Sequence, residues 1–176
     1  MVLQGPDYNH RMSTELHRKT APASVRCFVL TISDTRTEAT DTSGDAIAGL
    51  LTADGHDLAG RALVKDNPDA VRQALTRHAD TVDVVITTGG TGITSRDSTY
   101  EAIASLLDKR LDGFGELFRM LSFNEIGSAA MLTRACAGTL GKTAVFSLPG
   151  SEHAVRLGMT KLILPEIGHV VRELRR

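Results

Sequence analysis

The sequence contains no tryptophan, and aromatic residues make up only 4% of its 176 residues. Charge of either sign is also not in excess, because 20 lysines and arginines face 21 aspartates and glutamates. Such a chain offers nucleic acid neither a basic field nor aromatic platforms for base stacking. We therefore expect no nucleic-acid partner, and any anionic ligand must be bound through local geometry.

Cysteine is scarce as well. Cys27 and Cys136 lie far apart and show no CxxC or Cys/His spacing, which argues against a disulfide framework or a zinc site. The surroundings of Cys27, RCFVLTIS, are typical of a buried strand. Cys136 falls in a segment predicted to be helical, where an exposed thiol is one interpretation.

No apolar run approaches the roughly 20 residues needed to cross a bilayer. The N-terminal segment also lacks the apolar core of a secretory signal, so we expect a cytoplasmic location and no membrane partner. Residues 1–24 are polar and show no sustained periodicity. We interpret them as a flexible extension, or as an arm that becomes ordered against a partner subunit, and residues 25–176 as one domain.

Within that domain, strand-like apolar runs alternate with helical patterns. Strands are predicted at residues 26–33, 57–64, 82–88 and 143–150. Helices are predicted at residues 43–55, 67–80, 98–110, 116–127 (continuing through SAAMLTRACAG to Gly138), 151–159 and 164–175. The alternation predicts an α/β fold with a mostly parallel sheet covered on both faces.

Ligand sites in open parallel sheets lie outside the carboxyl ends of the strands. Four predicted loops meet that condition: SDTRTEATDTSG, KDNP, TTGGTGITSRD and SLPGSE. Their polar and glycine residues are candidate ligand contacts or, alternatively, ordinary caps and turns. Outside the glycine-rich loop, the candidates are Ser33, Asp34, Asp41, Ser43, Gly44, Asp66, Ser147, Pro149, Gly150 and Ser151.

The loop TTGGTG matches no standard nucleotide motif, and it is compatible with an ordinary tight turn. It also suits a phosphate, because glycine backbone N–H groups can approach an anion closely, threonine hydroxyls add donors, and a helix follows. Its candidate ligand contacts are Thr88, Gly89, Gly90, Thr91 and Gly92.

Two aspartates raise a second possibility. Asp97 is either the cap of the following helix or a ligand of a divalent cation such as Mg²⁺, which would reconcile its charge with a phosphate. Asp66 is either part of a turn or a metal ligand or base. Arg96 is a phosphate partner or a solvated side chain.

Seven motifs occur in order across about residues 25–172: TISD, DTSG, KDN, TTGGTG, SRD, GFGELFRMLSFNEIG and SLPGS. Together they resemble the MoaB/MogA family of molybdenum cofactor biosynthesis proteins, and the GFGELFRMLSFNEIG segment is more similar to the MoaB branch. The resemblance implies a three-layer α/β/α sandwich that assembles as a trimer or hexamer.

The resemblance also implies an activity, which is Mg²⁺-dependent transfer of AMP from ATP to molybdopterin, with release of pyrophosphate. The product would pass to a molybdate-inserting partner. Carried over by motif, the two important acidic positions are Asp66 and Asp97, and the glycine-rich, DTSG and LPGS loops would contact the ligands. Glu116 matches a further shared position. The alternative is a non-catalytic molybdopterin-binding or carrier protein of the same pathway.

Apolar side chains are unusually dense between Phe114 and Ile126, more than one helix face normally requires. Core packing explains part of this density, and a subunit interface is the alternative. The second interpretation agrees with the implied homo-oligomer.

Overall fold

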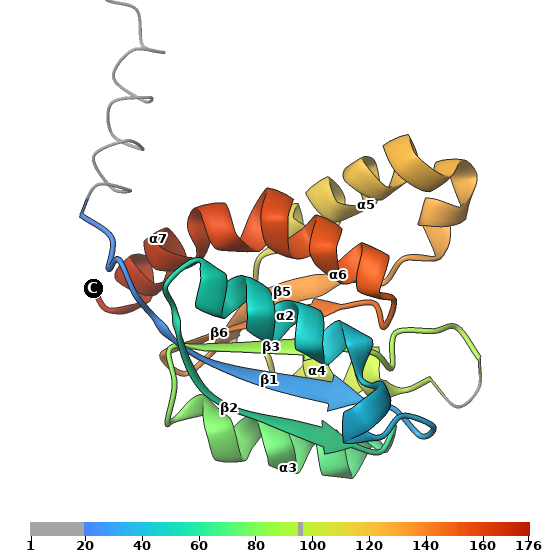
Figure 1. Ribbon diagram of the computed structural model, residues 1–176, viewed down its shortest axis with the longest axis horizontal. Helices are drawn as coiled ribbons and strands as arrows, with labels where there is room; N and C mark the ends of the chain where they lie inside the picture. The colour runs from blue at the N-terminus through green and yellow to red at the C-terminus, as the bar shows by residue number, and fades with distance from the viewer. Residues whose placement is uncertain (1–19, 95–96) are drawn as a thin grey trace, which may run out of the picture.

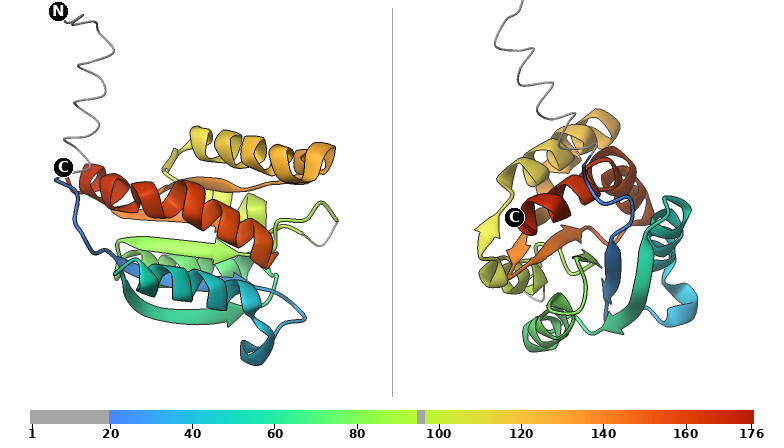
Figure 2. Two further views of the ribbon diagram at one scale, coloured as in Figure 1. Left: turned by 45° about the horizontal axis from the view of Figure 1, so that its top comes forward. Right: turned by 90° about the vertical axis from the view of Figure 1, so that its left-hand side faces the viewer.

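The computed structural model describes residues 20–94 and 97–176. Its centre is a six-stranded sheet in the order β2-β1-β3-β6-β5-β4, with helices on both faces (Figure 1, Figure 2). This arrangement confirms the expected single-domain α/β/α sandwich. Most of the predicted N-terminal extension, and Arg96, lie outside the described residues. Within the described ranges, no helix is both long enough and apolar enough to cross a bilayer.

The strands are β1 (Arg26–Ile32), β2 (Asp57–Val64), β3 (Val84–Thr88), β4 (Lys109–Arg110), β5 (Cys136–Leu140) and β6 (Thr143–Leu148). The α-helices are α2 (Thr42–Ala53), α3 (Pro68–Ala79), α4 (Thr99–Leu106), α5 (Asp112–Ile126), α6 (Glu152–Gly158) and α7 (Leu164–Leu174). Short 3₁₀ helices are η1 (Glu38–Thr40) and η2 (Gly127–Leu132), and a π-helical turn, η3 (Met159–Ile163), joins α6 to α7.

Strands β2, β1, β3 and β6 are parallel neighbours, so their carboxyl ends lie at one edge of the sheet. There, Thr88 of β3 pairs with Thr31 of β1 and with Leu148 of β6. Strand β5 runs antiparallel to β6, and β4 runs antiparallel to β5. The sheet is therefore mostly parallel, as predicted, and its order is extended on one side by the pair β5 and β4.

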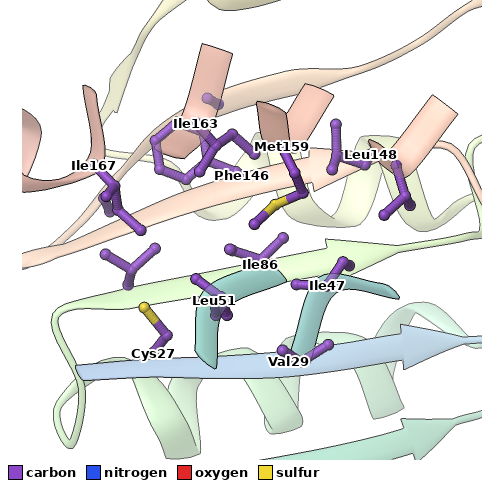
Figure 3. Close-up of a cluster of buried hydrophobic side chains, with 14 of the residues drawn as sticks. Cys27, Val29, Ile47, Leu51, Ile86, Phe146, Leu148, Met159, Ile163 and Ile167 are labelled. Carbon is purple, nitrogen blue, oxygen red and sulfur yellow. The ribbon is translucent and has the colours of Figure 1, made fainter. Parts of the chain in front are cut away.

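Each face of the sheet buries its own apolar cluster. One cluster, under α2, α6 and α7, includes Ile47, Leu51, Ile86, Met159 and Ile163 (Figure 3). The other, under α3 and α4, includes Phe28, Leu30, Val71, Leu75 and Ile103. Because both faces are covered, the central strands are apolar on both sides, which is the pattern that the sequence shows for β1 and β3.

Two helix starts follow directly from local sequence. The side chain of Asn67 accepts hydrogen bonds from the backbone N–H groups of Asp69 and Ala70, both at 3.0 Å, and Pro68 occupies the first helical position of α3. These contacts confirm the predicted start. Ser151 caps α6 by accepting from Ala154 N–H at 3.2 Å.

The predicted helix through SAAMLTRACAG is wrong. Helix α5 ends at Ile126, its C-cap Gly127 has a φ of +62°, and after the short η2 the chain forms strand β5. Small residues fit there because β5 lies close to its neighbour: a Cβ on Gly138 would collide with the carbonyl of Lys109. The predicted helix at 98–110 is also too long, because α4 ends at Leu106 and β4 follows.

Cys136 is correspondingly not an exposed thiol on a helix. It lies in β5 and is 4% exposed, and burial raises its thiol pKa to about 11. Cys27 is fully buried in β1, as predicted, and burial and then the nearby Asp83 raise its pKa to about 12. Neither thiol is a nucleophile at neutral pH.

Candidate functional site

Three of the four predicted loops meet at the carboxyl ends of β1, β3 and β6. The N–H of Gly89 donates to the carbonyl of Leu148 at 3.1 Å, and a Cβ on Gly150 would lie 3.3 Å from Gly89 Cα. On its other side, Gly89 faces the carbonyl of Ile32 so closely that a Cβ would collide with it. With a φ of +99°, this position requires glycine.

The glycine turn, defined as residues 89–94, is packed against the start of α4. Gly90 has a φ of +63°, and a Cβ there would lie 2.6 Å from the side chain of Thr99. Gly92 lies directly against the carboxylate of Asp97. The glycines therefore let the backbone approach these two side chains closely.

Four successive backbone N–H groups of the glycine turn donate to no residue that the structure describes. They belong to Gly90, Thr91, Gly92 and Ile93. Unpaired N–H groups of consecutive residues are the feature that proteins use to hold phosphates and other anions. The hydroxyl of Thr88 is by contrast engaged, since it donates to the carbonyl of Pro149 at 3.0 Å.

Asp97 closes the glycine turn and does not cap α4. Its Oδ2 accepts from the hydroxyl of Thr94 at 2.6 Å and from the Thr94 N–H at 2.8 Å. The N-cap of α4 is Ser98, without a side-chain cap bond, so the capping interpretation of Asp97 is wrong. The bonds from Thr94 favour the ionised carboxylate and lower the pKa of Asp97 from its ordinary value.

Asp66, in the loop after β2, contacts Thr99 of α4, which packs against the same turn. Its Oδ1 accepts from the hydroxyl of Thr99 at 2.6 Å, and its N–H donates to Asp34 Oδ1 at 3.2 Å. Lys65 donates to the backbone carbonyl of Asp34 at 2.8 Å. Asp34 therefore ties the loops after β1 and β2 together, and Thr99 links Asp66 to Gly90.

The two aspartates each keep one oxygen available. Among the described residues, no hydrogen bond is donated to Oδ1 of Asp97 or to Oδ2 of Asp66. No group of three or more His, Cys, Asp or Glu that could hold a metal ion occurs within the described ranges. Two carboxylate oxygens suit Mg²⁺, which usually combines one or two carboxylates with substrate phosphates and water.

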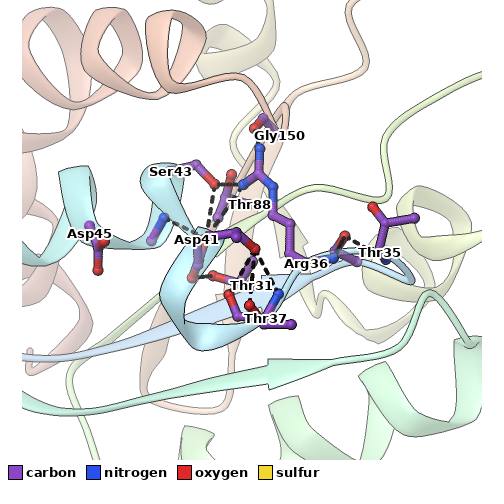
Figure 4. Close-up of polar contacts among 12 residues, drawn as sticks. Thr31, Thr35, Arg36, Thr37, Asp41, Ser43, Asp45, Thr88 and Gly150 are labelled. Carbon is purple, nitrogen blue, oxygen red and sulfur yellow. Dashed lines mark hydrogen bonds and ion pairs between the residues drawn. The ribbon is translucent and has the colours of Figure 1, made fainter.

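Asp41, in the loop after β1, is buried and fully engaged. Its carboxylate accepts from the Thr31 hydroxyl at 2.6 Å (Figure 4). It also accepts from the Gly44 N–H at 2.9 Å and pairs with Arg61 at 3.1 Å. Burial alone would raise the pKa of Asp41, but these hydrogen bonds and the Arg61 charge hold it below its ordinary value. The structure thus gives Asp41 internal partners, including the helix α2 that it caps.

Arg36 ties the loop after β1 to the turn after β6. Its guanidinium donates to the carbonyl of Gly150 at 2.6 Å, to Asp41 at 3.4 Å and to the hydroxyl of Ser43 (Figure 4). Ser43 and Gly150, both predicted ligand contacts, are therefore held by one arginine. The sequence interpretation missed Arg36, whose only signal was a cation in the loop that follows a buried strand.

The predicted serines differ in their surroundings. Ser33 accepts from the N–H groups of Thr35 and Arg36, and Ser151 caps α6. Ser147 is fully buried, and no described residue bonds to its hydroxyl. The same holds for the hydroxyl of Thr87, its neighbour across β3 and β6.

Glu116 belongs to α5 and not to any of the four loops. It is exposed on α5 and lines a cavity of about 260 Å³ together with Tyr100, Arg110 and Arg119. No hydrogen bond joins Glu116 to the glycine turn within the described part of the chain. Among the described residues, Glu116 therefore has no contact that ties it to the other candidates.

A second arginine was also missed. Arg134 precedes β5 and donates to backbone carbonyls of the glycine turn, including that of Thr91 at 3.1 Å. It lies inside the wrongly predicted helix, so no sequence pattern indicated that it would lie at this edge of the sheet. The reversed direction of β5 brings it there.

Known proteins resemble this chain over most of its length. A family model described as "Probable molybdopterin binding domain" matches residues 28–169. Molybdenum cofactor biosynthesis protein B of Bacillus cereus is 56% identical over 168 residues, covering 94% of this chain and 99% of the relative. The protein of the same name from Bacillus subtilis is 51% identical, with the same coverage of both chains.

Solved structures agree with these sequence matches. A crystal structure of molybdenum cofactor biosynthesis protein B has a TM-score of 0.85 at 56% identity, covering 89% of this chain and 99% of that one. The tungsten cofactor synthesizing protein MoaB from Pyrococcus furiosus has a TM-score of 0.80 at 41% identity, covering 89% and 100%. A MogA structure has a TM-score of 0.76 at 31% identity, covering 85% and 99%.

Proposed function

The chain belongs to the MoaB family of molybdenum cofactor biosynthesis proteins, and we propose that it transfers AMP from ATP to the terminal phosphate of molybdopterin. The observation that carries the proposal is the row of four N–H groups in the glycine turn that donate to no described residue, together with Asp97 bonded to Thr94 and Asp66 bonded to Thr99. The N–H groups suit phosphate oxygens, and the carboxylates suit a cation that accompanies them.

The reaction is a displacement at phosphorus. An oxygen of the molybdopterin phosphate attacks the α-phosphorus of ATP, the bond to the bridging oxygen breaks, and pyrophosphate leaves with the bonding electron pair. Because the attacking phosphate is already ionised, no strong general base is required. The protein has to align the two phosphates and neutralise their charge, which are tasks for fixed donors.

Asp66 and Asp97 would hold Mg²⁺ through their available oxygens. When bound, the cation supplies charge neutralisation for the phosphates of ATP and the leaving pyrophosphate. Thr94 and Thr99 hold the two carboxylates in place by donating to their other oxygens.

The test is pyrophosphate release from ATP, Mg²⁺ and molybdopterin. Asp66→Asn and Asp97→Asn should each slow release by at least about tenfold, the scale on which altered metal sites lose activity. Asp69→Asn is the matched control, because this aspartate lies on α3 with its side chain 83% exposed and should leave the rate unchanged. Near wild-type rates in both site variants would remove these aspartates from the mechanism.

A carrier role is the alternative outcome of the same assay. It predicts tight molybdopterin binding by the wild-type protein and no pyrophosphate release at saturating ATP and Mg²⁺. The intact pair of carboxylates favours the enzyme, since a pterin carrier has no need of them. If the protein is the enzyme, its adenylylated product would pass to a molybdate-inserting protein.

A second copy of this chain is proposed to cover the outer face of α5 and η2, giving a trimer or hexamer. Six large apolar side chains on this face are 47–80% exposed: Leu117, Met120, Phe123, Ile126, Met131 and Leu132. Only Ile93 joins them as a large exposed hydrophobic among the described residues. Exposed apolar patches of this kind mark protein interfaces, and α5 lies at the outer surface (Figure 2).

Light scattering tests the assembly. Phe123→Asp should shift the measured mass from three or six chains toward one, because a charge would be buried in an apolar contact. Thr76→Asp adds the same charge to exposed α3 on the opposite side of the sheet and should keep the wild-type mass. A wild-type protein that is monomeric at micromolar concentration would contradict the proposal.

A further inference from the structure

Arg134 spans the glycine turn with its guanidinium. Its Nε donates to the carbonyl of Thr91 at 3.1 Å, and its Nη2 donates to the carbonyls of Gly92 and, at 3.2 Å, Asp97. Its remaining nitrogen, Nη1, pairs with Glu101 of α4 at 2.5 Å. One side chain therefore binds three backbone carbonyls of a segment that lies about 40 residues away in the sequence.

These contacts fix the direction of the turn's N–H groups. In a trans peptide the C=O of one residue and the N–H of the next point in opposite directions, and the structure contains no cis peptide among its described residues. Carbonyls of Thr91 and Gly92 that face Arg134 therefore direct the N–H groups of Gly92 and Ile93 away from it. These are two of the four unpaired donors.

We propose that Arg134 is a positioning residue, which shapes the anion-binding face of the glycine turn by binding its carbonyls from behind. The inference rests on the proposed function, for which the turn's N–H groups hold phosphate oxygens. Arg134 acts through the backbone and touches neither substrate nor cation. Its role is to keep Gly92 N–H and Ile93 N–H pointing to the ligand side before a ligand arrives.

The surroundings of Arg134 keep the guanidinium itself in place. Its carbon Cζ lies 5.0 Å from the centre of the Tyr100 ring, and its side chain is only 22% exposed. Tyr100 and Glu101 both belong to α4, whose N-cap directly follows Asp97. Arg134 therefore connects the turn, the first residues of α4 and the start of β5 in a single unit.

Lysine cannot replace this residue. A guanidinium presents donors in a planar fork, so one group can reach carbonyls at separate positions and an acidic partner on its other side. An ammonium is a point charge on a flexible stem, and it cannot hold the same set of acceptors at once. Arg134→Lys should therefore keep the charge and lose the shape of the turn.

Amide order in the ligand-free protein tests the proposal independently of any reaction. With glycine selectively labelled with ¹⁵N, the amides of Gly90 and Gly92 should be rigid in the wild type on the picosecond-to-nanosecond timescale. They should become mobile in Arg134→Met and, to a smaller extent, in Arg134→Lys. Arg156→Met, which removes an exposed arginine from α6, is the matched control and should change neither amide.

A merely supportive role for Arg134 makes a different prediction. Arg134→Met would then lower the thermal unfolding midpoint, but the Gly90 and Gly92 amides would stay as rigid as in the wild type at temperatures well below that midpoint. This result would overturn the proposal. Arg134→Lys provides the same comparison if Arg134→Met does not fold. Glu101→Gln leaves the carbonyls bound, so a loss of order equal to that of Arg134→Lys would also count against the proposal.

Kinetics separate this inference from the proposed function. If the wild type releases pyrophosphate, kcat/KM in Arg134→Lys should fall by about 100-fold, the loss expected when reacting groups are misplaced by about 1 Å. If the wild type releases none, the proposed function fails, and the glycine amides still decide whether Arg134 shapes the turn.

Discussion

Two loop aspartates, Asp41 after β1 and Asp97 in the loop after β3, have similar chemistry and opposite surroundings. Each accepts a hydrogen bond from the backbone N–H of a residue three positions away in the sequence, and both have a lowered pKa. Asp41 is 3% exposed, and both of its oxygens have partners, among them Thr31, Arg36 and Arg61. Asp97 is half-buried, and its bonds from Thr94 reach one oxygen only.

The difference separates an acid that holds the fold from one that is available to a ligand. Both carboxylate oxygens of Asp41 accept hydrogen bonds inside the protein. Removing the carboxylate leaves the buried Thr31 hydroxyl and Gly44 N–H without their acceptor and takes one ion-pair partner from each of two arginines. Asp97 is held by one neighbour and keeps an oxygen available. Stability should therefore depend on the first aspartate and activity on the second.

The largest stability effect is expected for Asp41→Ala. It should lower the free energy of unfolding by about 3 kcal/mol, at the low end for losing one member of a buried pair because both arginines reach water. Urea denaturation measures the change. Asp45→Ala, which removes a 60% exposed partner of Arg61, should cost less than about 1 kcal/mol. Equal losses of unfolding free energy in the two variants would show that the buried Asp41 contributes no more to stability than the exposed Asp45.

A smaller effect is expected for Gly44→Ala, which tests how tightly α2 is packed on Asp41. The added Cβ would lie 2.7 Å from the hydroxyl of Thr31 and would collide with the Asp41 carboxylate, so about 2 kcal/mol of stability should be lost. Gly49→Ala, in the same helix with no atom within 4 Å, should stabilise the protein by about 0.5–1 kcal/mol. Urea denaturation measures both changes. If both variants were more stable than the wild type, the residues around Asp41 would have to move easily to accommodate the added methyl group.

The smallest stability effect is expected for Asp97→Asn. The amide oxygen of asparagine can still accept from Thr94, so the free energy of unfolding in urea should change by less than about 1 kcal/mol. The same variant should lose pyrophosphate release, as described above. A large loss of stability here would make Asp97 resemble Asp41 and would remove the contrast between the two loops.

Much of the edge of the sheet could be predicted because its signals are local. Gly89 and Gly90 adopt positive φ, which the presence of glycine indicates in the sequence, and Asn67-Pro68 marks a helix start. The parallel order of the strands also predicts that Asp66 lies near the glycine turn. The contact through Thr99 confirms that proximity.

The errors have a different physical origin. SAAMLTRACAG is rich in residues that tolerate a helix, but the close approach of β5 to β4 at Gly138 decides its conformation, and that is a tertiary contact. Arg36 and Arg134 donate to backbone carbonyls of distant loops. Every residue carries a carbonyl, so no side-chain pattern marks which ones an arginine will bind.

The reversed direction of β5 has a consequence for where ligand-site residues occur in sheets of this kind. In a purely parallel sheet, only residues that follow a strand can reach the ligand edge. One antiparallel strand reverses that rule locally. Arg134 precedes the antiparallel strand β5, and it lies beside glycine-turn residues that follow the parallel strand β3. A search for ligand-site residues that considers only the loops after strands would overlook such a residue. The residues just before each antiparallel strand should be considered as well.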